Sequence, residues 1–518
     1  MRSFIITLSV IVTLIPFYTL AQVSSNQKSC IPCEELRKMK LPDLTILKVE
    51  SKTKDTIRNQ EAWVPPVIIN VPFCRLECLI SKEIYFELLL PQKWNKRFLM
   101  SGNGGFAGTV QNNLLSYLNN GYAIVGTNTG HTGNGIQADW ALNNMERQLN
   151  FGQLAVHRTA VVSKSIIEKF YCSAPTYSYF LGCSRGGGQA MVEAQQFPDD
   201  FNGIVSGAPA FDWPAIGAKF IRECQANYPD PKDLKHPVIT NDNLKLLQKI
   251  VFEQCDQLDG LNDHILSDPR NCQLDLSKLP LCPNDIAASG CFTKQQLTAI
   301  RSVYEPVIID NAQIYPGFPP GLEAETGSWD AWITGTSPFM QGAPSLHYSF
   351  GTEVFKYLVY NDPSWSYSQY DFKNFIKETA YASAFLNATN TDYASFKKLN
   401  RKMIMYHGWN DPALSAFSTI QHYEDAMHKD NDLRSSIRLF LLPGVLHCGG
   451  GTGPDDVDWV VLIRDWVEKN KAPERVVLSK MENGKTIMTR PVFPYPKKAT
   501  YNGSGDANLE KNFGEKKE

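Results

Sequence analysis

Short apolar runs alternate with segments of helical periodicity along the first 210 residues. The runs predict strands at residues 73–91, where the pattern is that of a hairpin, and at 97–101, 122–126, 177–182 and 201–206. Apolar residues recur at helical spacing over residues 150–170, and a second helix is predicted to follow residue 182 and to end near residue 196. This alternation indicates the α/β class, with a parallel sheet covered by helices on both faces.

The alternation stops at about residue 211. The following residues are rich in Pro, Trp, Tyr, Asn, Asp and Cys and contain only scattered helical patterns. Strand-like runs return at residues 402–406 and 437–442. The expected organisation is an α/β core in two parts, residues 22–210 and 395–499, interrupted by an inserted lid domain, residues 211–394, and followed by a polar C-terminal tail, residues 500–518, without a core of its own.

The N-terminal residues 1–21 have the pattern of a secretory signal peptide. Arg2 supplies a positive charge, residues 4–20 are almost wholly apolar or small, and Ala21 offers a cleavage site. The alternative is a membrane anchor, but the run is short for a span and Pro16 interrupts it. We therefore expect an exported protein, secreted or periplasmic, with no membrane association after cleavage.

Composition and charge narrow the class of protein. Hydrophobic residues make up 43% of the chain, and 51 basic residues face 53 acidic ones, for a net charge of −2. These values exclude a disordered chain and argue against a nucleic-acid binder, which usually carries a basic excess.

The cysteines fit export. The chain has 12 cysteines, an even number that predicts disulfides in an oxidising compartment. For Cys30 and Cys33 we favour a structural pairing with Cys74 and Cys78 over a redox motif. Spacing does not fix the connectivity, and Cys172 and Cys224 are left without an assigned partner.

The segment from Gly182 to Gly186 fits the pattern G-x-S-x-G, with Ser184 at its centre. A predicted strand precedes it and a predicted helix follows it, which is the context of a nucleophile elbow. The glycines remove side chains that would clash at this sharp turn. The alternative is an ordinary glycine-rich helix start.

A serine nucleophile needs a base and an acid, which follow it in the order Asp and then His in this class of fold. His447 lies on a loop after the strand at residues 437–442, and Asp411 follows the strand before that one. His131, His407 and His422 are less well placed, and for them we favour core or surface roles. For the oxyanion, the expected donors are the N–H of Arg185 and an N–H from the glycine-rich turn, that of Gly104 or Gly105.

These residues carry a family resemblance. Cys183 directly precedes Ser184 and Cys448 directly follows His447, so the chain resembles the tannase and feruloyl esterase family with its CS-D-HC motif. The resemblance implies an α/β-hydrolase core with a lid, a Cys183–Cys448 disulfide, and hydrolysis of esters of aromatic acids. Two departures stand out: Arg185 replaces a frequent threonine, and no cysteine follows Cys448, so the tail should be less firmly tied down.

A carboxylate cluster lies in the expected lid. Asp256, Asp259 and Asp263 crowd into one short stretch, a pattern that suits Ca²⁺ but that alone is more often a solvated loop. The resemblance implies a structural Ca²⁺ held by these three side chains and by the carbonyls of Leu261 and Ile265. Flanking cysteines would close this loop and the next one, as Cys255 with Cys272 and Cys282 with Cys291.

The expected function is that of a secreted serine carboxylesterase acting on a small aryl ester, of the hydroxycinnamic or gallic type, free or linked to a plant polymer. Hydrolysis of a terephthalate monoester is the alternative with the same chemistry. A non-catalytic, calcium-stabilised binding protein is the alternative of another class, and the presence of a serine, an aspartate and a histidine argues against it. The lid aromatics Trp329, Trp332, Phe339, Tyr348 and Trp365 are expected to be mostly core.

Overall fold

The structure is a computed structural model that describes residues 26–58 and 65–516. The expected signal peptide lies outside the described residues. Within the described ranges, no helix is both long enough and apolar enough to cross a bilayer.

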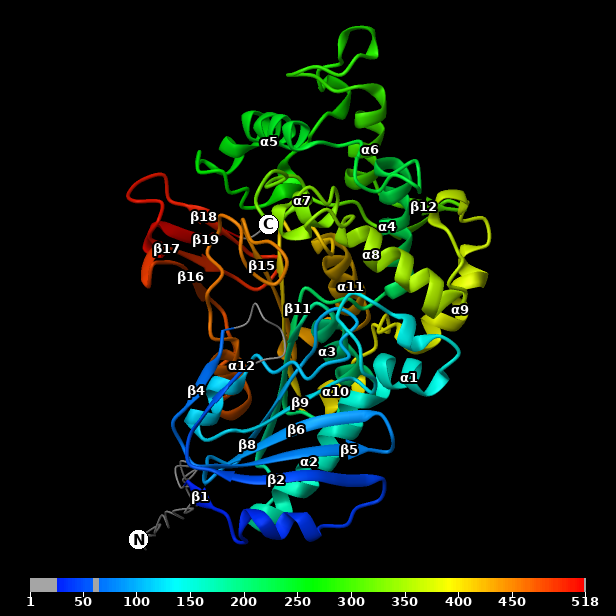
Figure 1. The fold of residues 1–518 in the computed structure, drawn as a ribbon. Coiled ribbons are helices and arrows are strands. Elements are labelled where there is room, and N and C mark those ends of the chain that lie inside the picture. Colours follow the sequence, from blue (N-terminus) through cyan, green and yellow to red (C-terminus); the bar gives the residue numbers. More distant parts are fainter. Residues whose placement is uncertain (1–25, 59–64, 517–518) are drawn as a thin grey trace, which may run out of the picture.

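A central sheet of nine strands forms the core of the fold (Figure 1). In spatial order the strands are β15 (Ile437–Leu442), β14 (Lys402–Gly408), β11 (Gly203–Gly207), β10 (Tyr177–Cys183), β8 (Arg97–Ser101), β9 (Ala123–Thr127), β6 (Ile84–Pro91), β5 (Phe73–Ile80) and β2 (Leu44–Lys52). The strands from β15 to β9 are parallel, which confirms the expected α/β class.

One edge of the sheet differs from the expected parallel sheet. Strands β6, β5 and β2 run antiparallel to their neighbours. Only residues 81–83 separate β5 from β6. Such a short turn allows only an antiparallel hairpin, because a parallel connection needs a crossover of a dozen or more residues.

Helices cover both faces of the sheet. Alternate residues of β8 point to opposite faces of the sheet. On one face, Phe98 and Met100 pack with α2 (Ala155–Tyr171), α3 (Arg185–Gln196) and α11 (Ala416–Lys429). Leu99 packs on the opposite face with α12 (Trp459–Lys469). The helix predicted at residues 150–170 begins with a π-helical turn at Asn150–Leu154 before α2. The sheet is therefore buried on both sides, as its apolar strands require.

The inserted residues form a mainly helical lid at one end of the sheet (Figure 1). Its helices are α4 (Trp213–Asn227), α5 (Asn241–Cys255), α6 (Lys294–Tyr304), α7 (Trp329–Trp332), α8 (Leu346–Glu353) and α9 (Phe375–Leu386), with a small hairpin of β12 (Val307–Ile309) and β13 (Ala312–Tyr315). The next helix, α10 (Ala394–Lys398), already packs against the core beside α3. Two apolar clusters lie mainly within this segment. The remaining short elements are α1 (Met145–Leu149) and the pairs β1 (Gln27–Lys28) with β7 (Lys93–Trp94) and β3 (Asp55–Ile57) with β4 (Val67–Ile69).

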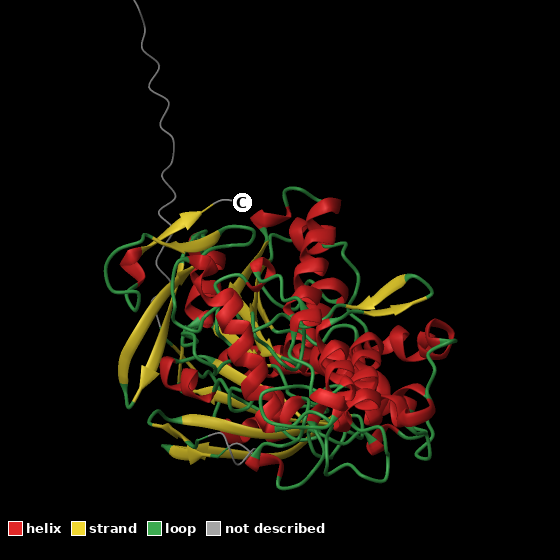
Figure 2. Cartoon of the chain, turned by 90° about the horizontal axis from the view of Figure 1, so that it is seen from above, coloured by secondary structure: helices red, strands yellow, loops and turns green. Residues whose placement is uncertain are grey.

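The C-terminal residues are folded more fully than we expected. After the ribbon of β16 (Val476–Glu482) and β17 (Lys485–Val492), β18 (Lys498–Tyr501) pairs with β19 (Phe513–Lys516) at the margin of the molecule (Figure 2). Phe513 is buried, and the guanidinium of Arg490 lies 4.8 Å from its ring centroid. One buried aromatic ring therefore anchors the polar tail on the ribbon of β16 and β17.

The described cysteines form five disulfides, namely Cys30–Cys172, Cys33–Cys74, Cys183–Cys448, Cys255–Cys272 and Cys282–Cys291. Cys78 and Cys224 are buried and unpaired. Our favoured pairing of Cys30 and Cys33 with Cys74 and Cys78 was therefore wrong for Cys30 and for Cys78. The N–H of Cys30 donates to the carbonyl of Phe170, which holds Cys30 beside Cys172 at the end of α2.

Candidate active site

Ser184 occupies the turn between β10 and α3, with φ 63° and ψ −123°, a conformation that side-chain-bearing residues rarely adopt. Glycines make this turn possible. A Cβ on Gly182 would lie 2.6 Å from the backbone of Gly186, and a Cβ on Gly102 would lie 2.8 Å from the same glycine. The sequence motif and the observed strain therefore agree on a nucleophile elbow.

His447 and Asp411 form a hydrogen-bonded pair at the ends of neighbouring strands. The distance from His447 Nδ1 to Asp411 Oδ2 is 2.7 Å. Asp411 is buried, and its other oxygen accepts hydrogen bonds from the N–H groups of Ala413 and Leu414. Burial alone would raise the pKa of the Asp411 carboxyl, but the two imidazoles beside it outweigh burial and lower the pKa. The acid is thus ionised and fixed in orientation.

His407 is the second imidazole beside this carboxylate. Its Nε2 lies 3.2 Å from Asp411 Oδ2 and 2.9 Å from the carbonyl of Leu414, and its Nδ1 lies 2.8 Å from the hydroxyl of Thr419. Sequence reasoning favoured a core or surface role for His407. The residue is buried, as a core role requires, but it also supports the candidate acid; its position four residues before Asp411 was the available indication.

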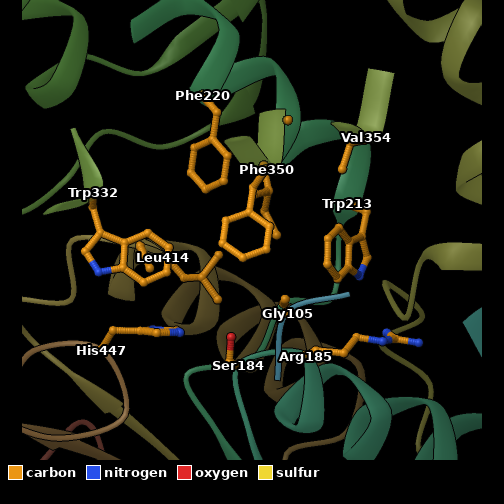
Figure 3. Close-up of a pocket in the computed structure, with 14 residues that line it drawn as sticks. Gly105, Ser184, Arg185, Trp213, Phe220, Trp332, Phe350, Val354, Leu414 and His447 are labelled. Carbon is orange, nitrogen blue, oxygen red and sulfur yellow. The ribbon is translucent and has the colours of Figure 1, made fainter. Parts of the chain in front are cut away.

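Ser184 and His447 line the same cavity (Figure 3). The serine oxygen points up into the cavity, and the imidazole lies at the same level on one side of it. No hydrogen bond joins these two side chains in the structure. Hydrogen bonds of catalytic groups are often long before substrate binds, so this geometry is compatible with a serine–histidine pair.

The structure separates the two candidate oxyanion donors of the glycine-rich turn. The N–H of Gly104 donates to Gln111 Oε1 at 2.5 Å, so it is already engaged. Gly105 lines the cavity with φ +52°. Arg185 is the first residue of α3, where an N–H has no acceptor within the helix. The backbone amides of Gly105 and Arg185 are therefore the better-placed pair.

The side chain of Arg185 is buried beneath the cavity wall. Its Nη2 donates to the carbonyls of Phe151 and Gly152, and its guanidinium carbon lies 4.5 Å from the Phe151 ring centroid and 5.8 Å from that of Trp213. Burial lowers its pKa to about 9. The residue that departs from the family pattern therefore braces the π-helical turn before α2, while its backbone faces the cavity.

The cavity is lined mainly by apolar side chains of the lid. The aromatic members are Trp213, Phe220, Trp332 and Phe350 (Figure 3). The Trp332 ring stands edge-on to His447, with centroids 5.1 Å apart. Sequence reasoning did not single out Trp213, Phe220 or Phe350, because no local motif distinguishes a cavity aromatic from a core aromatic.

The five lid aromatics named from the sequence lie in different surroundings. Trp332 alone lines the cavity. Trp329 is buried beside Tyr304, whereas Phe339 is 73% exposed. Tyr348 and Trp365 pack against the apolar cluster of the lid that includes Phe220 and Phe355.

The Cys183–Cys448 disulfide connects the residues beside Ser184 and His447, with Cα atoms 5.9 Å apart. It is the pairing that the family resemblance implies. The bond spans 265 residues of sequence, including the whole lid. It ties the nucleophile turn directly to the histidine loop.

The acidic lid loop is closed by the Cys255–Cys272 disulfide, and the next loop by Cys282–Cys291. Asp256 is buried and accepts hydrogen bonds from the N–H of His264. Burial raises the pKa of Asp256, and the carboxylates of Asp263 and Asp259 raise it further. Asp263 also pairs with Arg490 at 2.8 Å. The structure does not bring ligand oxygens of Asp256, Asp259 and Asp263 all within 4.8 Å of one another, and Asp259 accepts hydrogen bonds from the N–H groups of Leu261 and Ser267. An ion held by all three side chains would therefore have to draw them together, and it would share Asp263 with a guanidinium.

Comparisons with known proteins identify the family to which the chain belongs. The family model described as "Tannase and feruloyl esterase" matches residues 73–515. Feruloyl esterase B from Aspergillus niger is 31% identical over 84% of this chain and 85% of its own. An uncharacterized esterase from Xanthomonas campestris is 28% identical over 93% of this chain and 90% of its own.

Two solved structures share the fold. The crystal structure of feruloyl esterase B from Aspergillus oryzae superposes with a TM-score of 0.82, at 27% identity, over 93% of this chain and 99% of that one. A tannin acyl hydrolase from Aspergillus niger superposes with a TM-score of 0.73 at 20% identity, over 92% of this chain and 94% of that one, and supports the fold alone.

Proposed function

The chain belongs to the tannase and feruloyl esterase family and is a carboxylic ester hydrolase, and from this premise we propose that it is an exported serine esterase that cleaves esters of aromatic acids. The observation that carries the proposal is the strained Ser184 and the His447–Asp411 pair in one cavity with aromatic walls. A purely binding protein would have no need of this combination.

The chemistry follows from the positions of the groups. Ser184 Oγ attacks the ester carbonyl carbon while His447 Nε2 takes its proton. The oxyanion that forms accepts hydrogen bonds from the N–H groups of Gly105 and Arg185. His447 returns the proton to the leaving alcohol as the acyl-enzyme forms. Water then repeats the attack with the same base and releases the acid, and Asp411 stabilises the imidazolium in both halves.

The walls of the cavity support an aromatic acyl group. A planar ring can pack on Trp332 and Phe350, which themselves stack with centroids 6.0 Å apart. Hydroxycinnamic and gallic esters have such a ring, and so does a terephthalate monoester, which is the alternative with the same chemistry.

Export and calcium belong to the same proposal. The five disulfides of the described residues are typical of an oxidising compartment. In the lid, Asp256, Asp259 and Asp263 would hold Ca²⁺ with the carbonyls of Leu261 and Ile265. The ion would neutralise the three carboxylates and stabilise the loop, and it would take no part in ester hydrolysis.

Active-site labelling tests the proposal. A fluorophosphonate should label wild-type protein at Ser184, and Ser184→Ala should lose labelling and most turnover, whereas Ser504→Ala, at an exposed position, should keep both. Methyl ferulate, methyl gallate, chlorogenate and a terephthalate monoester then form the substrate panel. Labelling at another residue would overturn the assignment of the nucleophile. Hydrolysis of simple acetate esters with no turnover of any aryl ester would overturn the substrate class.

A further inference from the structure

A second polar cluster lies away from the active-site cavity, between α2 and α3. It consists of His157 on α2, Glu193 on α3 and Asp200 in the loop before β11. One ligand atom from each residue lies within 4.8 Å of the other two, and this is the only such trio of His, Cys, Asp or Glu within the described ranges. We call these three residues the helix-pair cluster.

Glu193 is the unusual member of the cluster. Its side chain is fully buried, and neither carboxylate oxygen receives a hydrogen bond from a donor among the described groups. The neighbouring Asp200 carboxylate could accept a hydrogen bond only from a protonated Glu193. A buried carboxylate without a partner is costly, so such a group generally has a cation, a proton or a water beside it. The neighbouring His157 Nδ1 and Asp200 Oδ2 are hydrogen-bonded to each other at 2.6 Å, so a metal that took both atoms as ligands would replace the proton between them and move them slightly apart.

We propose that His157, Glu193 and Asp200 bind one divalent transition-metal ion, with Zn²⁺ the best match. An imidazole nitrogen with two carboxylate oxygens is a donor set that Zn²⁺ accepts, whereas Ca²⁺ prefers oxygen alone. The His157 side chain is 31% exposed, so an ion can reach the site from solvent and keep a water as its fourth ligand.

Other positive groups near the helix-pair cluster could balance its two carboxylates in place of a metal ion. Lys164 lies 3.6 Å from Asp200 Oδ1 and donates to the backbone carbonyl of Asp200, so it balances the oxygen that faces away from His157. A proton on Glu193 is the second competitor, because burial and then the Asp200 carboxylate raise the pKa of Glu193. Arg401 is the remaining nearby cation, and it donates to the carbonyl of Pro198.

A metal at this point would be structural. It would tie α2 to α3, the helix that begins directly after Ser184. Glu193 follows Ser184 by nine residues (193 − 184), or about 13 Å along a helix that rises 1.5 Å per residue. The ion would therefore lie too far away to touch substrate, and its effect should appear in stability and metal content.

The test uses the full mature chain without a polyhistidine tag, stripped of metal and then dialysed against Zn²⁺ in excess Ca²⁺. One tightly bound Zn²⁺ per chain is expected. Co²⁺ bound in its place should give the visible absorption bands of a low-symmetry coordination site. Glu193→Gln and His157→Asn should each weaken Zn²⁺ binding by at least tenfold, since loss of even an outer-shell partner typically costs about 10–100-fold. His428→Asn, an exposed histidine on α11, is the matched control.

The outcomes separate the metal from its competitors. If a proton occupies the cluster, Glu193→Gln will keep its thermal stability and wild type will bind no more Zn²⁺ than the variant, which overturns the proposal. Equal Zn²⁺ binding by wild type, His157→Asn and Glu193→Gln also overturns it, because the ion is then elsewhere. If Glu193→Gln does not fold, His157→Asn decides the matter, because that side chain is partly exposed.

Discussion

Asp411 contacts two imidazoles, although the sequence motif names only one of them. His447 approaches Asp411 Oδ2 to 2.7 Å and His407 approaches the same oxygen to 3.2 Å. The N–H groups of Ala413 and Leu414 hold the other oxygen. A carboxylate fixed on both sides orients the base with little freedom, which favours a single tautomer of His447.

Replacing this carboxylate by an amide tests its role. Asp411→Asn keeps the shape of the side chain but loses the charge that stabilises the imidazolium, so kcat should fall by about 10⁴-fold with the fold intact. Steady-state kinetics with an aryl ester and a thermal melt measure the two effects. His407→Gln is the matched control and should lose far less, because it contacts the acid without reaching the cavity. A kcat of Asp411→Asn near that of wild type would remove Asp411 from the triad.

The glycine-rich turn offers a sharper comparison between adjacent residues. At Gly105, φ is +52° and a Cβ would lie 2.1 Å from the carbonyl oxygen of Gly135, whereas at Gly104 the nearest atom is Gln111 Oε1 at 3.4 Å. Gly105→Ala should therefore displace the oxyanion amide and lower kcat by about 10²–10³-fold, the typical loss for one oxyanion donor. Gly104→Ala should change kcat little. Equal losses in both variants would show that the turn contributes shape and not a specific donor.

Local motifs explain why some site residues could be predicted and others could not. Ser184, Asp411 and His447 follow strands within short, recognisable patterns, so the sequence places them at one edge of the sheet. Trp213 and Phe350 come from separate lid helices, and only the tertiary packing of the lid brings them together. Burial of aromatic rings in a core and in a cavity leaves the same pattern in a sequence.

At the scale of elements, the core was predicted well and the lid poorly. The hairpin at residues 73–91 and the strand at residues 437–442 match the structure, because period-two alternation and short apolar runs are local signals. The lid helices are mostly flanked by proline-rich or polar loops, and their packing is set by contacts between segments far apart in sequence. The antiparallel pairing of β5 with β6 follows from the short turn between them, and the hairpin predicted at residues 73–91 already implied that turn.

The disulfide between the nucleophile turn and the histidine loop joins two elements that are otherwise far apart in sequence. Replacing both Cys183 and Cys448 by Ser should lower kcat by about 10²-fold, because a displacement of about 1 Å can cost that much. KM should change less, since the aromatic walls remain. The melting temperature should fall only moderately, because the other disulfides stay in place.

The matched control for this change is Cys282→Ser with Cys291→Ser. That disulfide spans only nine residues of a lid loop, and neither of its cysteines lines the cavity. It should leave kcat at the wild-type value. If both double variants lose activity equally, the effect of the Cys183–Cys448 bond lies in general stability and not in catalytic register.

At the scale of the whole molecule, the active site exists only where lid and core meet. The core supplies Ser184 and His447, and the lid supplies most of the cavity wall. The lid is held to the core by its two chain crossings and by contacts such as Arg490 with Asp263, which join the C-terminal ribbon to the acidic loop. Stabilising that loop therefore stabilises the arrangement of the two parts.

Calcium removal tests this link. If Ca²⁺ binds Asp256, Asp259 and Asp263 only in the folded state, a chelator should lower the melting temperature by several degrees, because an ion present at 100 times its Kd contributes about 2.7 kcal/mol. Activity in the fraction that stays folded should fall less, since the loop lies outside the cavity. Differential scanning calorimetry with and without chelator measures the shift, and metal analysis measures the Ca²⁺ content.

Variants and add-back assign the shift to one site. Asp259→Asn should melt lower than wild type and be insensitive to chelator, whereas Asp275→Asn, in a neighbouring lid loop where the carboxylate caps a short turn, should respond like wild type. Added Ca²⁺ should restore the stripped protein and added Zn²⁺ should not, which separates this loop from the helix-pair cluster. Unchanged melting in excess chelator, with no Ca²⁺ in the protein, would show that Arg490 and the backbone N–H groups alone balance the loop.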